Sequence, residues 1–131
     1  MTEKRFDEWN ELKKTIHTRN KQREYREGEV WWYFAGENIG REINGKGPIF
    51  IRPILIIRKY GKESFFGVPL STKAQTGRWF SPLEVNRKPA VVLLSQAGSF
   101  SVNRLRGCLD RISGPELSRI REELSYLLFK K

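Results

Sequence analysis

A chain of 131 residues is long enough for one domain with a substantial core and too short for two. Its formal net charge of +10 favours a polyanionic partner such as nucleic acid or an acidic protein. One cysteine and one histidine exclude an internal disulfide, a Cys/His zinc cluster and a pair of catalytic histidines. Any chemistry must therefore come from Arg, Lys, Ser, Thr, Tyr, Asp or Glu.

The first 27 residues form an appendage to the main fold. Apolar residues recur at helical spacing and predict an amphipathic helix from residue 3 to about 18: Phe6, Trp9, Leu12 and Ile16. A basic joint follows, which divides the chain into an N-terminal helix with its joint, residues 1–27, and a main domain, residues 28–131. The N-terminus lacks the apolar core of a signal peptide, and no stretch approaches a membrane span. We therefore expect a cytoplasmic protein that does not contact a membrane.

Short strand-like segments dominate the main domain. They run over residues 29–35, 49–59, 63–71, 78–83, 90–96 and 105–109. Turn signals at Gly61, Gly77 and Pro89 separate them, and this spacing predicts a compact antiparallel barrel or a tightly coiled sheet.

The chain ends in a helix. Ser113, with Glu116 three residues later, predicts a capping box, and Pro115 fits the first turn. The expected apolar face consists of Leu117, Ile120, Leu124 and Leu128. The sequence thus predicts a mainly β protein with an amphipathic helix at each end.

The run "PIFIRPILII", residues 48–57, resembles a strand buried on both faces but contains Arg52 and Pro53. Arginine resists burial and proline cannot donate to a strand ladder. One interpretation is an edge strand whose arginine reaches water along its aliphatic stem. The alternative is that Arg52 serves a ligand.

Two loops offer surfaces for an anion. The segment "GENIGREINGKGP" holds four glycines in thirteen residues and can approach a ligand closely, although it is neither a GxGxxG motif nor a P-loop. The segment "STKAQTGRWFSPLEVNRKP" interleaves cations such as Lys73 and Arg78 with Trp79. Cations over phosphates and aromatic rings under unpaired bases are typical of single-strand binding. A barrel strand with a solvated basic face explains the same pattern.

These segments carry a resemblance to a known family. "REGEVWWYFAGENIGREINGKGPIFIRPILIIRKYGKESFFGVPLSTK", then "VVLLSQAGSFSVNRL" and a final amphipathic helix resemble the PemK/MazF toxins of type II toxin-antitoxin systems. The resemblance spans roughly residues 27–128, and the N-terminal helix resembles an extension of some PemK-like proteins. It implies an SH3-like barrel of CcdB/MazF type that dimerises, binds a cognate antitoxin and cuts single-stranded RNA without a metal or other cofactor.

By position, the resemblance assigns the catalytic roles to Arg52 and Ser71. A guanidinium can hold two phosphate oxygens while a hydroxyl orients the scissile phosphate. Together with the basic loops, the resemblance assigns RNA contacts to Glu42, Lys46, Thr72, Lys73, Arg78, Trp79, Ser95 and Gln96.

The chain departs from the family pattern at Gly98, which stands where members commonly carry an arginine, two residues after Gln96. We expect altered cleavage preference or reduced activity from this loss of a cation. Two further classes of function remain: a barrel that binds RNA or an antitoxin without cutting, and a gyrase poison of CcdB type. The second depends on a tryptophan near the chain end, and "LLFKK" contains none. The N-terminal helix either covers a barrel face or contributes to antitoxin recognition.

Overall fold

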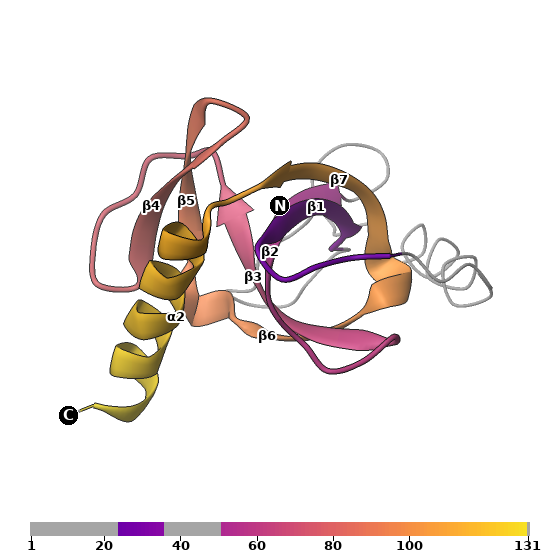
Figure 1. Ribbon diagram of the computed structural model, residues 1–131. Helices are drawn as coiled ribbons and strands as arrows, with labels where there is room; N and C mark the ends of the chain where they lie inside the picture. The colour runs from indigo at the N-terminus through magenta and orange to yellow at the C-terminus, as the bar shows by residue number, and fades with distance from the viewer. Residues whose placement is uncertain (1–23, 36–50, 131) are drawn as a thin grey trace, which may run out of the picture.

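The computed structural model describes residues 24–35 and 51–130, which form a bent antiparallel sheet and one C-terminal helix (Figure 1). The strands are β1 (Glu29–Phe34), β2 (Ile51–Lys59), β3 (Ser64–Ser71), β4 (Phe80–Val85), β5 (Lys88–Leu93), β6 (Gly98–Ser101) and β7 (Leu105–Arg111). Two 3-10 turns, η1 (Leu94–Gln96) and η2 (Val102–Arg104), flank β6, and α2 (Gly114–Phe129) ends the fold. The expected N-terminal helix lies outside the described residues.

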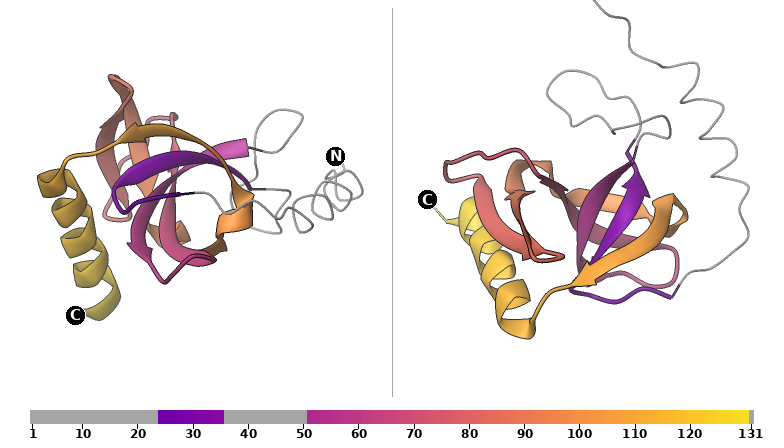
Figure 2. Two further views of the ribbon diagram at one scale, coloured as in Figure 1. Left: turned by 45° about the vertical axis from the view of Figure 1, so that its right-hand side comes forward. Right: turned by 90° about the horizontal axis from the view of Figure 1, so that it is seen from above.

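The sheet is a half-barrel with strand order β4-β5-β3-β2-β1-β7, and β6 pairs with β3 beyond the end of β5. The two edge strands approach each other, since the backbone N–H of Asn86, after β4, donates to the carboxylate of Asp110 in β7 at 2.7 Å. Figure 2 shows α2 beside the β4–β5 hairpin, on one side of the curved sheet. The expected antiparallel β architecture is confirmed for the described part of the chain.

Strand β2 is central, because it pairs with β1 on one side and β3 on the other. The interpretation of an edge strand with a water-facing arginine is therefore wrong, and the side chain of Arg52 is only 8 % exposed. Pairing with β3 begins at Ile54 whereas pairing with β1 continues to Ile51. Pro53 thus lies just beyond the end of the β3 ladder, where a missing N–H donor costs least.

The structure differs from the expected segments around β4, β5 and β6. The strands expected at 78–83 and 90–96 are Phe80–Val85 and Lys88–Leu93, and residues 94–96, expected to end a strand, form η1. Strand β6 was not expected, because "GSFS" is too short and too polar to show an alternating pattern. Pro89 lies inside β5, opposite Glu84, and does not mark a turn. The turn falls at Asn86 and Arg87, whose φ values of 53° and 64° form a two-residue hairpin connection.

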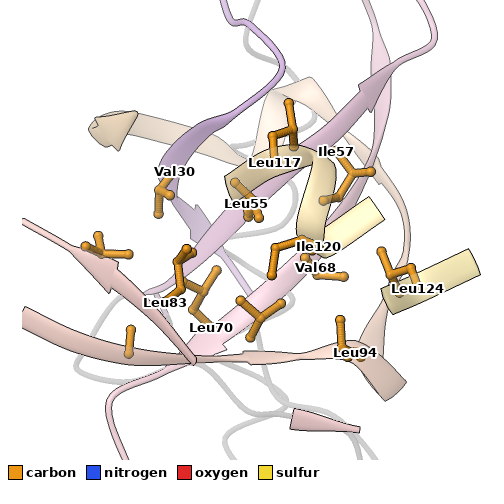
Figure 3. Packing of buried hydrophobic residues seen from close by; sticks show 13 residues of the cluster. Val30, Leu55, Ile57, Val68, Leu70, Leu83, Leu94, Leu117, Ile120 and Leu124 are labelled. Atoms are coloured by element: carbon orange, nitrogen blue, oxygen red, sulfur yellow. The ribbon is translucent and has the colours of Figure 1, made fainter. Parts of the chain in front are cut away.

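The main core lies between the sheet and α2 (Figure 3). Leu117, Ile120 and Leu124 of the helix are buried as expected and face side chains of the strands. Leu128 is not part of this face, because it is 51 % exposed where the last turn of α2 extends past the sheet (Figure 1). The buried face of α2 therefore ends before the last turn of the helix.

Polar contacts fix α2 at both its start and its middle. The Ser113 hydroxyl accepts a hydrogen bond from the backbone N–H of Glu116 at 3.3 Å, which confirms the cap, while the carboxylate of Glu116 pairs with Arg119 at 3.2 Å. Further along, Nη2 of Arg121 donates to the carbonyl oxygen of Ile57 at 2.6 Å and to Glu27 at 2.9 Å. This clamp joins the helix to β2 and to the chain before β1.

A second core cluster fills the opposite face of the sheet and includes Tyr25, which is 2 % exposed. The Tyr25 hydroxyl donates to the carbonyl oxygens of Gly61 and Ser64 at 2.7 and 2.9 Å. Its ring packs against Phe65, with centroids 5.7 Å apart. Alternate residues of β2 serve the two clusters, so Arg52, Ile54 and Ile56 share the face of this second cluster.

Candidate active site

Arg52 and Ser71 meet where β2 begins and β3 ends. Ile54 of β2 lies opposite Pro69 of β3, and continuing this register by two residues places Arg52 opposite Ser71 on the same face. Both residues line a pocket of about 330 Å³, which we name the Arg52 pocket. The two residues that the sequence selected as catalytic are therefore neighbours across two strands.

The guanidinium of Arg52 is held in a mostly buried position. Its Nη1 donates to the carbonyl oxygen of Leu70 at 3.4 Å. Burial lowers the pKa of Arg52, and the nearby Tyr33 opposes this effect. Because the pKa of arginine lies far above neutrality, the side chain stays charged. A cation in a poorly hydrated position acts more strongly on an anionic ligand than one in bulk water.

Tyr33 lies between two arginines that sequence reasoning did not connect. On β1 it is opposite Arg52 of β2 and opposite Leu105 of β7, next to Arg104. Nη1 of Arg104 donates to the carbonyl oxygen of Phe34 at 3.4 Å. Burial raises the pKa of Tyr33 to about 12, although both arginine charges act in the other direction. Tyr33 therefore keeps its proton at neutral pH, and its hydroxyl can both donate and accept a hydrogen bond.

The sequence contained only indirect signals for Tyr33 and Arg104. Arg104 belongs to the "NRL" stretch that carried part of the family resemblance, and alternation along "VWWYF" separates the face of Tyr33 from that of Trp32. Neither signal reveals which strands are neighbours, and it is the pairing of β1 with both β2 and β7 that brings the two arginines to one tyrosine.

The hydroxyl of Ser71 is oriented by the loop that follows β3. Its Oγ accepts a hydrogen bond from the backbone N–H of Lys73 at 3.1 Å, as in a serine turn. Because the oxygen is occupied as an acceptor, the hydroxyl hydrogen can donate to a ligand. Thr72 lines the same pocket, and Lys73 is exposed next to it.

Arg78 and Trp79 do not join the Arg52 pocket. Arg78 lines a different groove of about 500 Å³ beside α2, together with Glu122 and Glu123. Trp79 packs on the main core, and its carbonyl oxygen accepts from the N–H of Leu94 at 2.9 Å. These positions fit a structural part for Trp79 and place Arg78 near two carboxylates.

The remaining expected RNA contacts divide into two groups. Ser95 and Gln96 form part of η1, where Ser95 is exposed and Gln96 half-buried, and neither lines the Arg52 pocket. Glu42 and Lys46 lie outside the described residues. Within residues 24–35 and 51–130, no three His, Cys, Asp or Glu side chains are grouped so that they could hold a metal ion.

A family model described as "PemK-like, MazF-like toxin of type II toxin-antitoxin system" matches residues 26–128. The chain belongs to this toxin family. Among curated proteins no match was found. No helix in the described part of this PemK/MazF-like chain has both the length and the apolar character needed to span a bilayer.

Solved structures show the same fold. A mycobacterial endoribonuclease in complex with its cognate antitoxin is 14% identical, with a TM-score of 0.61 over 82% of this chain and 98% of that one. MazF from Deinococcus radiodurans is 19% identical, with a TM-score of 0.62 over 79% and 96%. A MazE–MazF structure from the same organism is 18% identical, with a TM-score of 0.55 over 82% and 97%. The half-barrel with its C-terminal helix is thus a MazF-like fold.

Proposed function

We propose that this protein is the toxin of a type II toxin-antitoxin system and that it cuts single-stranded messenger RNA without a metal, thereby inhibiting translation and growth. The observation that carries the proposal is that Arg52 and Ser71 line the same pocket, in a chain of the PemK/MazF-like family. The net charge of +10 supports a polyanionic substrate.

In the proposed reaction the ribose 2′-oxygen attacks the adjacent phosphorus in line, and the bond from phosphorus to the 5′-oxygen breaks. The 2′-hydroxyl loses a proton and the 5′-oxygen gains one, so the products are a 2′,3′-cyclic phosphate and a 5′-hydroxyl. Arg52 holds two phosphate oxygens and offsets the charge that develops as phosphorus binds a fifth oxygen. Ser71 donates its hydroxyl hydrogen to the phosphate and orients it. Tyr33 lies opposite Arg52 on β1 and is buried, so it would support the guanidinium and would not contact the phosphate itself.

The proposal includes two protein partners. A cognate antitoxin with an acidic, disordered segment would cover the basic surface and silence the enzyme, and a second copy of the chain would complete a homodimer. The mycobacterial relative, solved with its cognate antitoxin, supports the first of these. The N-terminal helix belongs to this proposal as a candidate recognition element, to be tested by deleting residues 1–20 and measuring solubility and antitoxin affinity separately.

The decisive experiment incubates the protein with a long unstructured RNA in EDTA and analyses the product ends. Cyclic-phosphate ends are expected from the natural protein. Arg52→Ala should lower the rate by about 100- to 1,000-fold or more, as for removal of a transition-state donor, while thermal unfolding shows that the barrel persists. Arg111→Ala, an exposed cation at the far end of β7, is the matched control. Unchanged cutting by Arg52→Ala overturns the assignment, and intact RNA with the natural protein supports a binding module without catalysis.

A further inference from the structure

The turn between β2 and β3 lies at the opposite end of these strands from the Arg52 pocket, and the function above does not use it (Figure 1). Its sequence, "RKYGKE" over residues 58–63, holds three cations and one carboxylate, and we name it the basic turn. All of its residues are exposed. The stretch of β2 from Arg52 to Lys59 spans about 23 Å, so the basic turn is separate from the catalytic pocket.

Contacts from two distant parts of the chain hold the backbone of the basic turn in place. The Tyr25 hydroxyl hydrogen-bonds to the carbonyl oxygens of Gly61 and Ser64 at 2.7 and 2.9 Å. The backbone N–H of Val102 donates to the carbonyl oxygen of Glu63 at 2.8 Å. Because these contacts fix the backbone, the exposed side chains of the turn are positioned before a ligand binds, and little backbone entropy is lost on binding.

The side chains of the basic turn combine cations with one exposed aromatic ring. Tyr60 is 55 % exposed, and its hydroxyl forms a hydrogen bond of 3.0 Å with the hydroxyl of Ser99 in β6. The side chain of Arg58 is 70 % exposed, and its Nε lies 3.9 Å from a carboxylate oxygen of Glu27. Glu27 pairs more closely with Arg121, at 2.9 Å, so its charge is shared between two cations. The turn therefore presents positive charge and an aromatic ring to solvent together.

The basic joint that precedes β1 enters the described fold beside this turn. Residues 13–26 carry six Lys or Arg and one Glu, and the structure describes the last three of these positions. Tyr25 is buried against the turn, with Nζ of Lys59 at 4.5 Å from the centre of its ring. Arg26 is exposed next to it. The positive charge of the joint thus meets the positive charge of the basic turn at Tyr25.

We propose that the basic turn is a second RNA contact, which binds the strand at a distance from the phosphate at Arg52. Its cations would pair with backbone phosphates, and the ring of Tyr60 would stack on one unpaired base. An acidic protein segment would satisfy the cations alone, whereas RNA satisfies both the cations and the ring, so Tyr60 favours RNA. This inference rests on the proposed function for its substrate, and it applies to RNA long enough to span about 23 Å from the Arg52 pocket.

The test measures binding and cleavage by the full-length protein separately. Binding is titrated over a series of salt concentrations with a long fluorescent single-stranded RNA whose 2′-O-methyl groups prevent cutting. The triple variant Arg58→Gln, Lys59→Gln and Lys62→Gln removes three phosphate contacts, so the slope of log affinity against log salt should fall by about 2. At about 0.15 M salt this corresponds to about 50-fold lower affinity, if the contacts have no effect at about 1 M.

Cleavage is measured on a short RNA of about 6 nucleotides around one cut site mapped on a long RNA, since such an RNA at the Arg52 pocket is too short to depend on the basic turn. The triple variant should cut this RNA at the natural rate. An equal loss of charge elsewhere, in Arg106→Gln, Arg111→Gln and Lys130→Gln, is the matched control, because these exposed cations lie on β7 and at the end of α2. It should keep most of the salt slope, and thermal unfolding checks that each variant retains the fold.

The aromatic ring is tested by two single substitutions. Tyr60→Leu should weaken binding of the long RNA about 5-fold or more, the lower end of the effect of one stacked base. Tyr60→Phe keeps the ring and loses only the bond to Ser99, so it should bind as the natural protein does. Neither substitution should change the affinity for polyglutamate, an acidic chain without bases.

An unchanged salt slope in the triple variant overturns this inference and leaves the proposed function intact. Weaker binding of polyglutamate by the triple variant, with no effect of Tyr60→Leu on RNA, assigns the turn to an acidic protein and also overturns it. Binding of RNA that depends on the turn, without cleavage of any RNA by the natural protein, removes the proposed function while the RNA contact stands.

Discussion

The substitution Gly98→Arg tests whether the missing family arginine limits this protein. Gly98 of β6 lies opposite Gly67 of β3, and residues 67, 69 and 71 share one face of β3, which is also the face of Arg52. A Cβ added at Gly98 would meet no atom within 4 Å. A side chain is therefore sterically accepted there, and it leaves the strand on the face of the Arg52 pocket.

The magnitude follows from strand geometry. Four residues along β3 span about 13 Å, and the neighbouring strand is about 4.8 Å away, so the Cα atoms of residues 98 and 71 are about 14 Å apart. An extended arginine side chain spans about 7 Å, which leaves its guanidinium about 7 Å from a phosphate at Ser71. At that distance, a unit charge contributes about 0.6 kcal/mol at the dielectric constant of water and about 2.4 kcal/mol at an effective value of 20. We expect kcat/KM for RNA cleavage to rise about 3- to 60-fold.

The assay measures initial cleavage rates at low and high salt on one RNA that is too short to reach the basic turn. Gly98→Gln controls for side-chain volume. Gly61→Arg controls for charge, because it also has open space at its Cβ but lies in the turn between β2 and β3, at the far end of β3 from Ser71. The gain of Gly98→Arg should fall as salt screens the added charge. The reasoning is refuted if Gly98→Arg is no faster than Gly61→Arg, or if its gain does not depend on salt.

Three further predictions concern stability. Gly67→Ala should cost about 1–3 kcal/mol in urea unfolding, because its Cβ would meet the Phe65 ring at 2.8 Å and the Leu55 carbonyl at 3.0 Å; an unchanged midpoint would show that the strands can separate freely. Arg87→Gly should stabilise the protein by about 1 kcal/mol, because Arg87 has a φ of 64° that disfavours residues with a Cβ; a lower melting temperature contradicts this. A hydrogen bond from the backbone N–H of Lys59 and, next, the interaction with Arg121 lower the pKa of Glu27 from its usual 4.5. The contribution of the Glu27 carboxylate to the free energy of unfolding is therefore present above pH 4.5, and it is lost as pH falls through the lower pKa of the folded protein. Glu27→Gln should therefore weaken the dependence of the free energy of unfolding on pH below 4.5. The same pH dependence in both proteins would exclude the contacts of Glu27 as its source.

Much of the fold could be predicted from periodicity and turn chemistry. The limits of β1, β3 and α2 follow from alternating or helical apolar patterns with recognisable ends, and they agree with the structure within two residues. The turn predicted at Pro89 was wrong, because proline is common in turns but here lies in a strand. The actual turn uses Asn86 and Arg87, and nothing in a sequence marks an arginine that adopts a positive φ.

The candidate site was predictable only where a resemblance marked it. Arg52 and Ser71 were selected from a family pattern, and their proximity follows from antiparallel pairing of consecutive strands. Tyr33 and Arg104 required the pairing of β1 with β7, strands that are more than seventy positions apart in the sequence. Arg78 shows that a sequence pattern can also suggest a site residue wrongly placed with the others. Its basic, aromatic-containing loop resembles an RNA-binding surface in sequence, yet the fold places this residue beside α2.

The position of α2 bears on the order in which the parts of this fold can pack. Leu117, Ile120 and Leu124 complete a core whose other walls come from strands made much earlier, and Arg121 closes on Ile57 and Glu27. Until α2 has been made and has docked, the apolar face of β2 and β3 is therefore exposed. The half-barrel thus depends on a segment made after all of its strands, and unfolding of α2 alone would uncover a surface prone to aggregation.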